Sequence, residues 1–142
     1  MKVAVGSDHA GLSLKNLIAA HLLSRGHDVV DVGTHEAMSC NYPDFAKQVA
    51  YLVRDGETDR GVLVCGTGQG MAMTANKVLG VRAAVVSDPF SARMTMAHND
   101  ARVLCLGERV VGQGVAIACL DAWLETQFEG GRHQTRVEMM EG

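Results

Sequence analysis

Short apolar runs recur along the chain, separated by longer stretches in which apolar and polar residues alternate with helical spacing. The runs are rich in valine, which is typical of parallel strands that are buried on both faces. They occupy residues 3–5, 29–32, 62–65, 83–86 and 103–106. This pattern predicts five short strands.

The stretches between the runs carry helix signals. Apolar residues at helical spacing predict helices over residues 14–22, 45–52, 71–78, 88–96 and 115–128. Asp88 followed by Pro89 is suited to the N-cap and first position of the fourth helix. Strands that alternate with helices predict a three-layer α/β/α fold, Rossmann-like, with a five-stranded parallel sheet.

In such sheets, ligands bind at the carboxyl ends of the strands, near a switch in strand order. Two polar, glycine-rich segments follow predicted strands: residues 6–11 after the first and residues 66–70 after the third. We therefore expect the functional site at this edge of the sheet.

Length and charge narrow the class of protein. The 142 residues are one domain's worth of chain, and we expect a single domain over residues 1–142. Thirteen Lys and Arg against 16 Asp and Glu give a net charge of −3, which disfavours nucleic acid or an anionic membrane as the main partner. No apolar run approaches the roughly 20 residues of a membrane span, and we expect no secretory signal. Four cysteines without a CxxC pair are typical of reduced thiols in the cytoplasm.

The Gly66–Gly70 loop opens a predicted helix, so its amides and the helix dipole favour an anionic group. A dinucleotide fingerprint would need glycine at Met71 and an acidic residue near position 90, and no Gly-Lys-Ser/Thr phosphate loop occurs. A nucleotide-binding module is therefore disfavoured. A tight turn without a ligand remains the alternative.

Cys65 ends the third strand beside this helix N-terminus, where a thiolate is favoured over the thiol. Such a thiolate can act as a nucleophile or as a general base. A buried structural cysteine is the alternative, and we assign that role to Cys105 and Cys119.

Among the histidines, His9 follows a strand in a glycine-bounded loop, where it can contact a ligand. His98 precedes a strand in a polar segment that is either part of a site or a helix cap. His21, His27 and His35 are expected to be solvated. No histidine or cysteine pair has metal-ligand spacing, so we expect no metal.

Arg132 and Arg136 share one face of a short terminal helix, a spacing suited to gripping one anion. Arg109 follows the last strand. In an acidic protein, this local positive charge indicates a small molecule that bears a phosphate, although a solvated basic patch is the alternative.

Seven motifs in order resemble the family of B-type ribose-5-phosphate isomerases, which is shared with galactose-6-phosphate isomerase subunits. The resemblance covers essentially the whole chain. The motifs are Gly6–Gly11, Asn41–Asp44, Cys65–Gly70, Ala75–Lys77, His98–Asp100, Gly107–Gly112 and Glu129–Arg136.

The resemblance implies interconversion of an aldose phosphate and its ketose, D-ribose 5-phosphate and D-ribulose 5-phosphate, through a cis-enediolate and without metal or organic cofactor. It makes Cys65 the base, with Thr67 and the loop amides as donors to the enediolate, and His98 the group that opens the sugar ring. The substrate-binding residues that it implies are Asp8, His9, Tyr42, Gly66, Gly68, Gln69, Gly70, Asn99, Arg109, Arg132 and Arg136.

The resemblance also implies a homodimer with the active site between subunits, the C-terminal helix reaching the partner; a tetramer stays open. Two positions depart from the family. Met71 stands where one branch has a glutamate base, and Gln69 replaces a smaller apolar residue. The alternatives are an isomerase of a related four- or six-carbon sugar phosphate, such as an allose, galactose or tetrose phosphate, and a catalytically silent sugar-phosphate-binding subunit.

Overall fold

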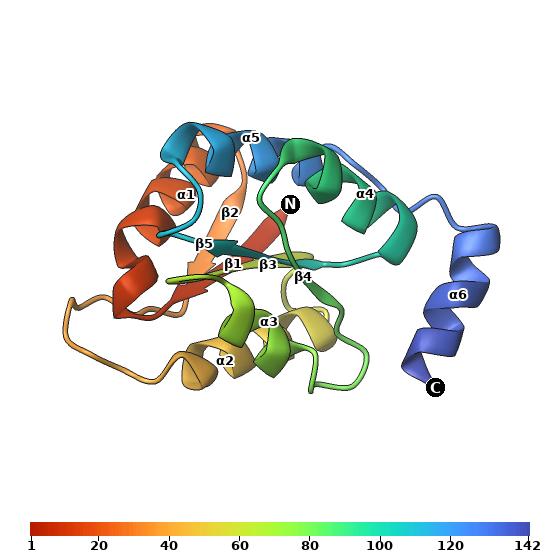
Figure 1. The fold of residues 1–142 in the computed structure, drawn as a ribbon, viewed down its shortest axis with the longest axis horizontal. Coiled ribbons are helices and arrows are strands. Elements are labelled where there is room, and N and C mark those ends of the chain that lie inside the picture. Colours follow the sequence, from red (N-terminus) through yellow and green to blue (C-terminus); the bar gives the residue numbers. More distant parts are fainter.

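The computed structural model describes residues 1–142. Five strands alternate with helices, as the apolar runs predict (Figure 1). In chain order, the elements are β1 (Lys2–Ser7), a short 3₁₀ helix (His9–Gly11), α1 (Leu12–Ser24), β2 (Asp28–Asp31), α2 (Tyr42–Arg54), β3 (Arg60–Cys65), α3 (Gln69–Ala75), β4 (Ala83–Val85), α4 (Pro89–Asn99), β5 (Val103–Gly107), α5 (Gln113–Leu124) and α6 (Arg132–Glu141).

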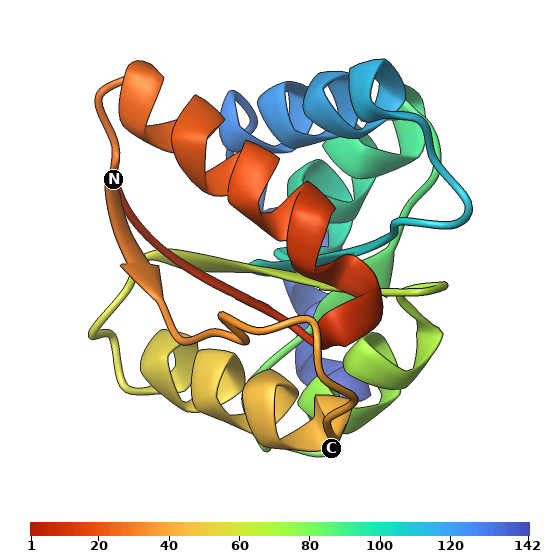
Figure 2. The same ribbon diagram turned by 90° about the vertical axis from the view of Figure 1, so that its left-hand side faces the viewer.

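The five strands form one parallel sheet in the order β2-β1-β3-β5-β4. Helices α1, α4 and α5 cover one face, and α2 and α3 cover the other (Figures 1 and 2). The predicted three-layer α/β/α fold is confirmed. The chain leaves β1 toward one edge of the sheet and returns on the other side at β3, so the switch in strand order lies between β1 and β3.

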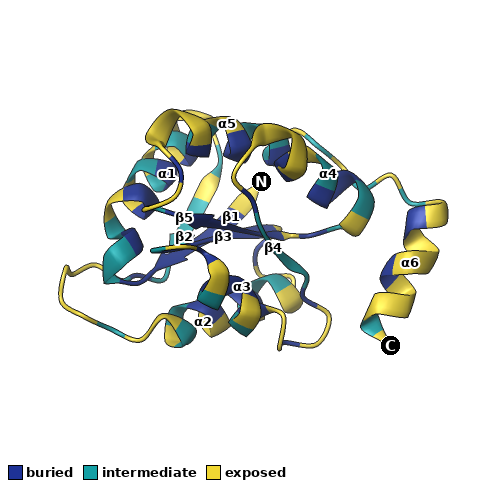
Figure 3. Ribbon diagram, in the orientation of Figure 1, coloured by how far each residue is buried: buried dark blue, intermediate teal, exposed yellow.

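Side chains along each strand point alternately into two separate cores. In β1, Val3 and Val5 pack into the core beneath α1, α4 and α5, whereas Ala4 packs into the core above α2 and α3. Because both faces are covered, the central strands are buried along their length apart from Lys2 at the start of β1 (Figure 3). This two-sided burial explains the continuous valine runs.

Two helices end earlier than the apolar pattern predicts. Helix α3 covers Gln69–Ala75 instead of 71–78, since Asn76 leaves the helix and bonds through its side-chain amide to both the N–H and the C=O of Ala83 on β4. Helix α5 ends at Leu124 instead of residue 128, where the Arg60 guanidinium donates to the carbonyls of Trp123 and Thr126.

A buried ion pair joins α1 to the segment after β2. The Lys15 side chain is fully buried, and its ammonium donates to both carboxylate oxygens of Asp31 at 2.8 and 2.9 Å and to the Thr34 carbonyl at 2.8 Å. Asp31 also accepts from the Gly33 N–H at 2.9 Å. Ser7, at the end of β1, exchanges backbone hydrogen bonds with Gly33 and Thr34. The ion pair therefore steadies the chain beside the carboxyl end of β1.

Helix α6 lies at the far side of the molecule from the segment that links β2 to α2 (Figure 1). It buries only His133 and Val137, and the rest of its surface is exposed or half-buried (Figure 3). None of the helices is long and apolar enough to cross a membrane.

Candidate active site

A cavity of about 420 Å³ opens at the carboxyl ends of β1 and β3, at the switch in strand order. All of its lining residues except Ala10 were expected from the sequence, and Ala10 lies within the glycine-bounded segment that follows β1. The lining residues are Asp8, His9, Ala10, Tyr42, Cys65, Gly66, Thr67, Gly70 and Arg109. The expected Gly68 and Gln69 belong to the same loop but do not line the cavity.

Cys65 ends β3 with its side chain in the cavity wall, and the residue is only 6% exposed. Its Sγ accepts a hydrogen bond from the Gly68 N–H at 3.1 Å. Gly68 is the N-cap of α3 and has a φ of 80°, a left-handed conformation that glycine adopts without strain. The loop therefore directs a backbone N–H at the sulfur.

Asp8 and His9 reach the cavity from the end of β1. The Asp8 Oδ1 accepts from the amides of Ala10 and Gly11 at 3.0 and 3.1 Å, which fixes the carboxylate at the start of the 3₁₀ helix. The Cys40 N–H donates to His9 Nδ1 at 3.3 Å. This hydrogen bond leaves the proton of a neutral His9 ring on Nε2, where it can be donated to a ligand.

Tyr42 and Arg109 close two sides of the cavity. The Tyr42 ring lies on Gly70, so closely that a Cβ added at Gly70 would come within 2.5 Å of the ring's Cζ. The Arg109 N–H donates to the Gly66 carbonyl at 3.1 Å, which ties the loop after β5 to the loop after β3. Arg109 forms no ion pair, so its guanidinium is free to bind an anion.

Four residues that were expected at the site do not line this cavity: His98, Asn99, Arg132 and Arg136. Helix α4 runs from the carboxyl end of β4 back toward the amino end of β5, so its last turn lies at the opposite end of the sheet from Cys65. Within one chain, these four residues and the Cys65 cavity are separate.

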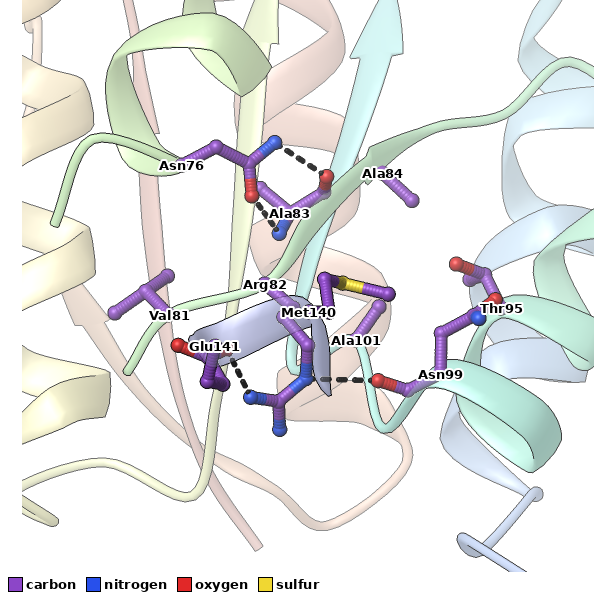
Figure 4. A pocket seen from close by; sticks show the side chains of 10 residues that line it. All are labelled: Asn76, Val81, Arg82, Ala83, Ala84, Thr95, Asn99, Ala101, Met140 and Glu141. Atoms are coloured by element: carbon purple, nitrogen blue, oxygen red, sulfur yellow. Dashed lines mark hydrogen bonds and ion pairs between the residues drawn. The ribbon is translucent and has the colours of Figure 1, made fainter. Parts of the chain in front are cut away.

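Asn99 lines a second cavity, of about 350 Å³, between β4, the end of α4 and the end of α6 (Figure 4). There the Asn99 carbonyl accepts from Arg82 Nε at 2.8 Å, and Arg82 also pairs with Glu141 of α6 at 2.6 Å. Arg132 and Arg136 are exposed on α6.

His98 belongs to a cluster that sequence spacing did not reveal. Its ring stacks on that of His133, with centroids 4.2 Å apart and planes 13° from parallel. Glu129 Oε1 lies 3.7 Å from His133 Nε2 and 4.0 Å from His98 Nε2. Burial, together with the nearby charges of His98 and Arg132, lowers the pKa of His133. The only signal in the sequence was the four-residue step from Glu129 to His133, because His98 is distant along the chain.

None of the remaining cysteines and histidines lines the cavity. Cys40 lies next to it, because its N–H donates to His9. Cys105 and Cys119 are fully buried in the two cores. Burial raises the pKa of the Cys119 thiol to about 11 and raises that of Cys105 further. His21 is not simply solvated, since its Nε2 lies 2.8 Å from Asp121 Oδ1.

Residues 3–140 match the model of the ribose/galactose isomerase family, and the chain belongs to this family. Among curated relatives, it is 52% identical to ribose-5-phosphate isomerase B of Escherichia coli, over 96% of this chain and 92% of that protein. It is also 41% identical to a D-erythrulose-4-phosphate isomerase of Pectobacterium atrosepticum, over 97% of this chain and 91% of that protein.

Solved structures agree with this assignment. Ribose-5-phosphate isomerase B of Clostridium thermocellum superposes with a TM-score of 0.98 at 52% identity, covering 99% of this chain and 95% of that one. Ribose-5-phosphate isomerase B of Mycoplasma genitalium, solved with bound ribulose-5-phosphate, gives a TM-score of 0.95 at 42% identity, covering 99% and 94%. The family resemblance seen in the sequence is confirmed.

Proposed function

We propose that this protein is an aldose–ketose isomerase that interconverts D-ribose 5-phosphate and D-ribulose 5-phosphate, acting in the cytosol. The observation that carries the proposal is the Cys65 thiol in the wall of the cavity, with a backbone N–H directed at its sulfur. The names of the relatives supply the substrate class. The free Arg109 and the His9 ring supply groups that bind a phosphate.

In the proposed reaction, the Cys65 thiolate removes the proton from C2 of the open-chain aldose and returns it to C1. The electron pair left by that proton forms the C1–C2 double bond of a cis-enediolate, and a proton moves from O2 to O1. Negative charge on the enediolate oxygens is stabilised by the Thr67 hydroxyl and the loop amides, donors already held in place before the reaction. No metal or organic cofactor is needed for this proton transfer.

The rest of the cavity would hold the substrate. Asp8, held by two amides, accepts hydrogen bonds from sugar hydroxyls, and Tyr42 lines the wall beside Gly70 of the loop. Arg109 and His9 bind the phosphate. Binding energy from the phosphate, which does not react, then positions C1 and C2 against the sulfur.

We further propose that the complete site forms between two copies of the chain. His98, Asn99, Arg132 and Arg136 lie at the opposite end of the sheet from the Cys65 of their own chain. They can meet a Cys65 cavity only if it belongs to a second chain. The exposed α6 and the Phe90 side chain, 62% exposed, are surfaces suited to that contact.

The base is tested by following ketose formation from D-ribose 5-phosphate with wild type, Cys65→Ala and Cys119→Ala. Cys119 is the matched control, because it is a buried cysteine outside the cavity. We expect Cys65→Ala to lose turnover while ribose 5-phosphate still raises its thermal midpoint, and Cys119→Ala to retain turnover. Turnover that survives in Cys65→Ala contradicts the assignment of the base. If the wild-type protein binds ribose 5-phosphate without converting it, the result would indicate a catalytically silent sugar-phosphate-binding subunit.

The two-chain site is tested by mixing two inactive variants, Cys65→Ala and His98→Ala, under conditions that exchange subunits. A mixed dimer carries both lesions in one site and none in the other, so random exchange restores about a quarter of the wild-type activity. If both groups acted within one chain, the mixture would stay inactive.

A four-carbon substrate is the second candidate, favoured by the D-erythrulose-4-phosphate isomerase among the relatives. The same catalytic base and the same phosphate-binding residues would serve either sugar. Comparing kcat/KM for D-ribulose 5-phosphate and D-erythrulose 4-phosphate decides between them, and a Gln69→Ala variant shows whether the longer side chain on the loop affects the choice.

A further inference from the structure

Helix α1 begins without a side-chain cap from its own sequence. Its N-cap residue is Gly11, which has no side chain to offer, and its first turn contains no acidic residue. The free N–H groups and the dipole at a helix N-terminus favour a carboxylate there. Glu108, 94 residues beyond Leu14 in the chain, supplies one, because its Oε1 accepts a hydrogen bond from the Leu14 N–H at 2.6 Å.

Glu108 is also bonded to the segment that follows β3. Its N–H donates to the Cys65 carbonyl at 2.9 Å, and the N–H of Arg109 donates to the Gly66 carbonyl at 3.1 Å. In the sheet, β3 lies between β1 and β5, so no backbone ladder joins the ends of those two strands. The Glu108 side chain joins them directly, since it reaches from the residue after β5 to the helix that follows β1. One residue thus links three of the segments that line the Cys65 cavity.

The two segments that Glu108 joins carry the proposed phosphate-binding groups of this chain. His9 opens the 3₁₀ helix that runs directly into α1, so the hydrogen bond at Leu14 steadies the helix on which His9 is placed. Arg109 is the next residue after Glu108. Since His9 and Arg109 both line the cavity, their separation depends on how the start of α1 and the end of β5 are held together.

Glu108 and Arg109 are neighbours of opposite charge, but neither takes part in an ion pair. A carboxylate bound to Arg109 would occupy the guanidinium donors that a phosphate needs. Because the Glu108 carboxylate caps α1 instead, it holds the end of β5 in place without competing for those donors.

We propose that Glu108 is a positioning residue that holds Arg109 and His9 at the separation that a phosphate group requires, and that it acts as a hydrogen-bond acceptor rather than through its charge. The assignment of these two side chains to the phosphate rests on the proposed function. Groups that are held in place before a ligand arrives bind it more tightly, because less freedom is lost on binding. Charge alone predicts the opposite, since removing a carboxylate from beside an anion site should strengthen anion binding.

The test measures binding of inorganic phosphate to the full-length protein by calorimetry, together with KM and kcat for D-ribose 5-phosphate. Glu108→Ala should weaken phosphate binding by about two- to tenfold, the effect expected when one long side chain must be ordered on binding. KM should rise by a similar factor with kcat little changed, since phosphate contacts act mainly as uniform binding. Glu108→Gln, whose amide oxygen can still accept from Leu14, should bind phosphate at least as tightly as wild type.

Asp59→Ala is the matched control, because Asp59 also accepts a hydrogen bond from the backbone N–H of a distant residue, Lys2, at 2.8 Å. Asp59 precedes β3, at the end of the sheet opposite the cavity. Asp59→Ala should lower Tm, as Glu108→Ala should, without changing the affinity for phosphate. If Glu108→Ala does not fold, Glu108→Asp replaces it, since it keeps the charge on a shorter side chain and should also weaken phosphate binding.

Phosphate binding in Glu108→Ala that is as tight as in wild type, or tighter, would overturn the positioning role. Equal weakening in Glu108→Gln or in Asp59→Ala would overturn it as well. Failure of the proposed function has a different signature. If wild type binds phosphate but converts none of the sugar phosphates, the isomerase assignment fails, and the calorimetric comparison still decides the role of Glu108. If wild type binds no phosphate, the phosphate site and its positioning residue are both overturned.

Discussion

The buried ion pair between Lys15 and Asp31 leads to an asymmetric prediction about stability. The Lys15 side chain is 0% exposed, whereas that of Asp31 is 28% exposed. Replacing Asp31 with Asn leaves a buried ammonium whose remaining acceptors are neutral oxygens, the Thr34 carbonyl among them. Replacing Lys15 with Met leaves a carboxylate that reaches water and still accepts from the Gly33 N–H.

The magnitudes follow from this difference. An uncompensated buried charge destabilises a fold by about 3–5 kcal/mol, which we expect for Asp31→Asn. Lys15→Met loses three hydrogen bonds but also removes the cost of burying the ammonium, and its flexible apolar chain replaces the lysine stem, so we expect about 1–2 kcal/mol. The double variant should lie close to Lys15→Met rather than at the sum of the two losses.

The assay is urea unfolding followed by the fluorescence of Trp123, the only tryptophan in the chain and fully buried. All variants are compared at one protein concentration, because the proposed assembly of two chains would make the apparent stability depend on concentration. For a chain of this length, a loss of about 3 kcal/mol should lower Tm by roughly 10 °C. A smaller loss for Asp31→Asn than for Lys15→Met would refute the reasoning, since it would mean that the ammonium tolerates burial without its partner.

Three further outcomes are expected. Gly70→Ala should reduce kcat/KM by displacing the Tyr42 ring that lies on Gly70, and an unchanged kcat/KM would show that the ring position does not matter. Cys119 should resist alkylation near pH 8 in the folded protein and react in urea, as peptide mass spectrometry can show, because a pKa of about 11 leaves roughly a thousandth of it as thiolate. Burial lowers the pKa of His27, so the unfolded chain takes up this proton first and stability should fall as the pH drops through about 6.5. His27→Gln should flatten that part of a plot of urea midpoint against pH, and an equally steep plot would contradict the assignment.

Much of the fold could be predicted from the sequence, because burial on both faces leaves a local signal. The valine runs located all five strands, and Asp88 with Pro89 located the start of α4, where the Asp88 carboxylate accepts from the Ser91 N–H at 2.7 Å. The ends of α3 and α5 could not be predicted. They depend on side-chain hydrogen bonds outside the helix, from Asn76 to Ala83 seven residues further on and from Arg60 to Trp123 in a distant part of the chain.

In the candidate site, too, some positions could be predicted from the sequence and others could not. Residues directly after β1 and β3 share one edge of the sheet, so the positions of Asp8 and Cys65 follow from the alternation of strands and helices. The approach of His133 to His98 could not be foreseen, because it depends on how the chain folds back after α5. In the proposed two-chain site, Arg132 and Arg136 reach Arg109 only from a second chain, and no local pattern encodes such a contact.

The bond between Asn76 and Ala83 has a consequence beyond the end of α3. β4 is an edge strand of three residues, and its outward-facing N–H and C=O groups are a template on which a foreign strand could pair. The Asn76 amide occupies both outward groups of Ala83, at 2.8 and 2.9 Å, in the manner of a neighbouring strand (Figure 4). One side chain thus pairs the outward backbone groups of Ala83, which leaves a foreign strand fewer free groups on which to pair along this edge of the sheet.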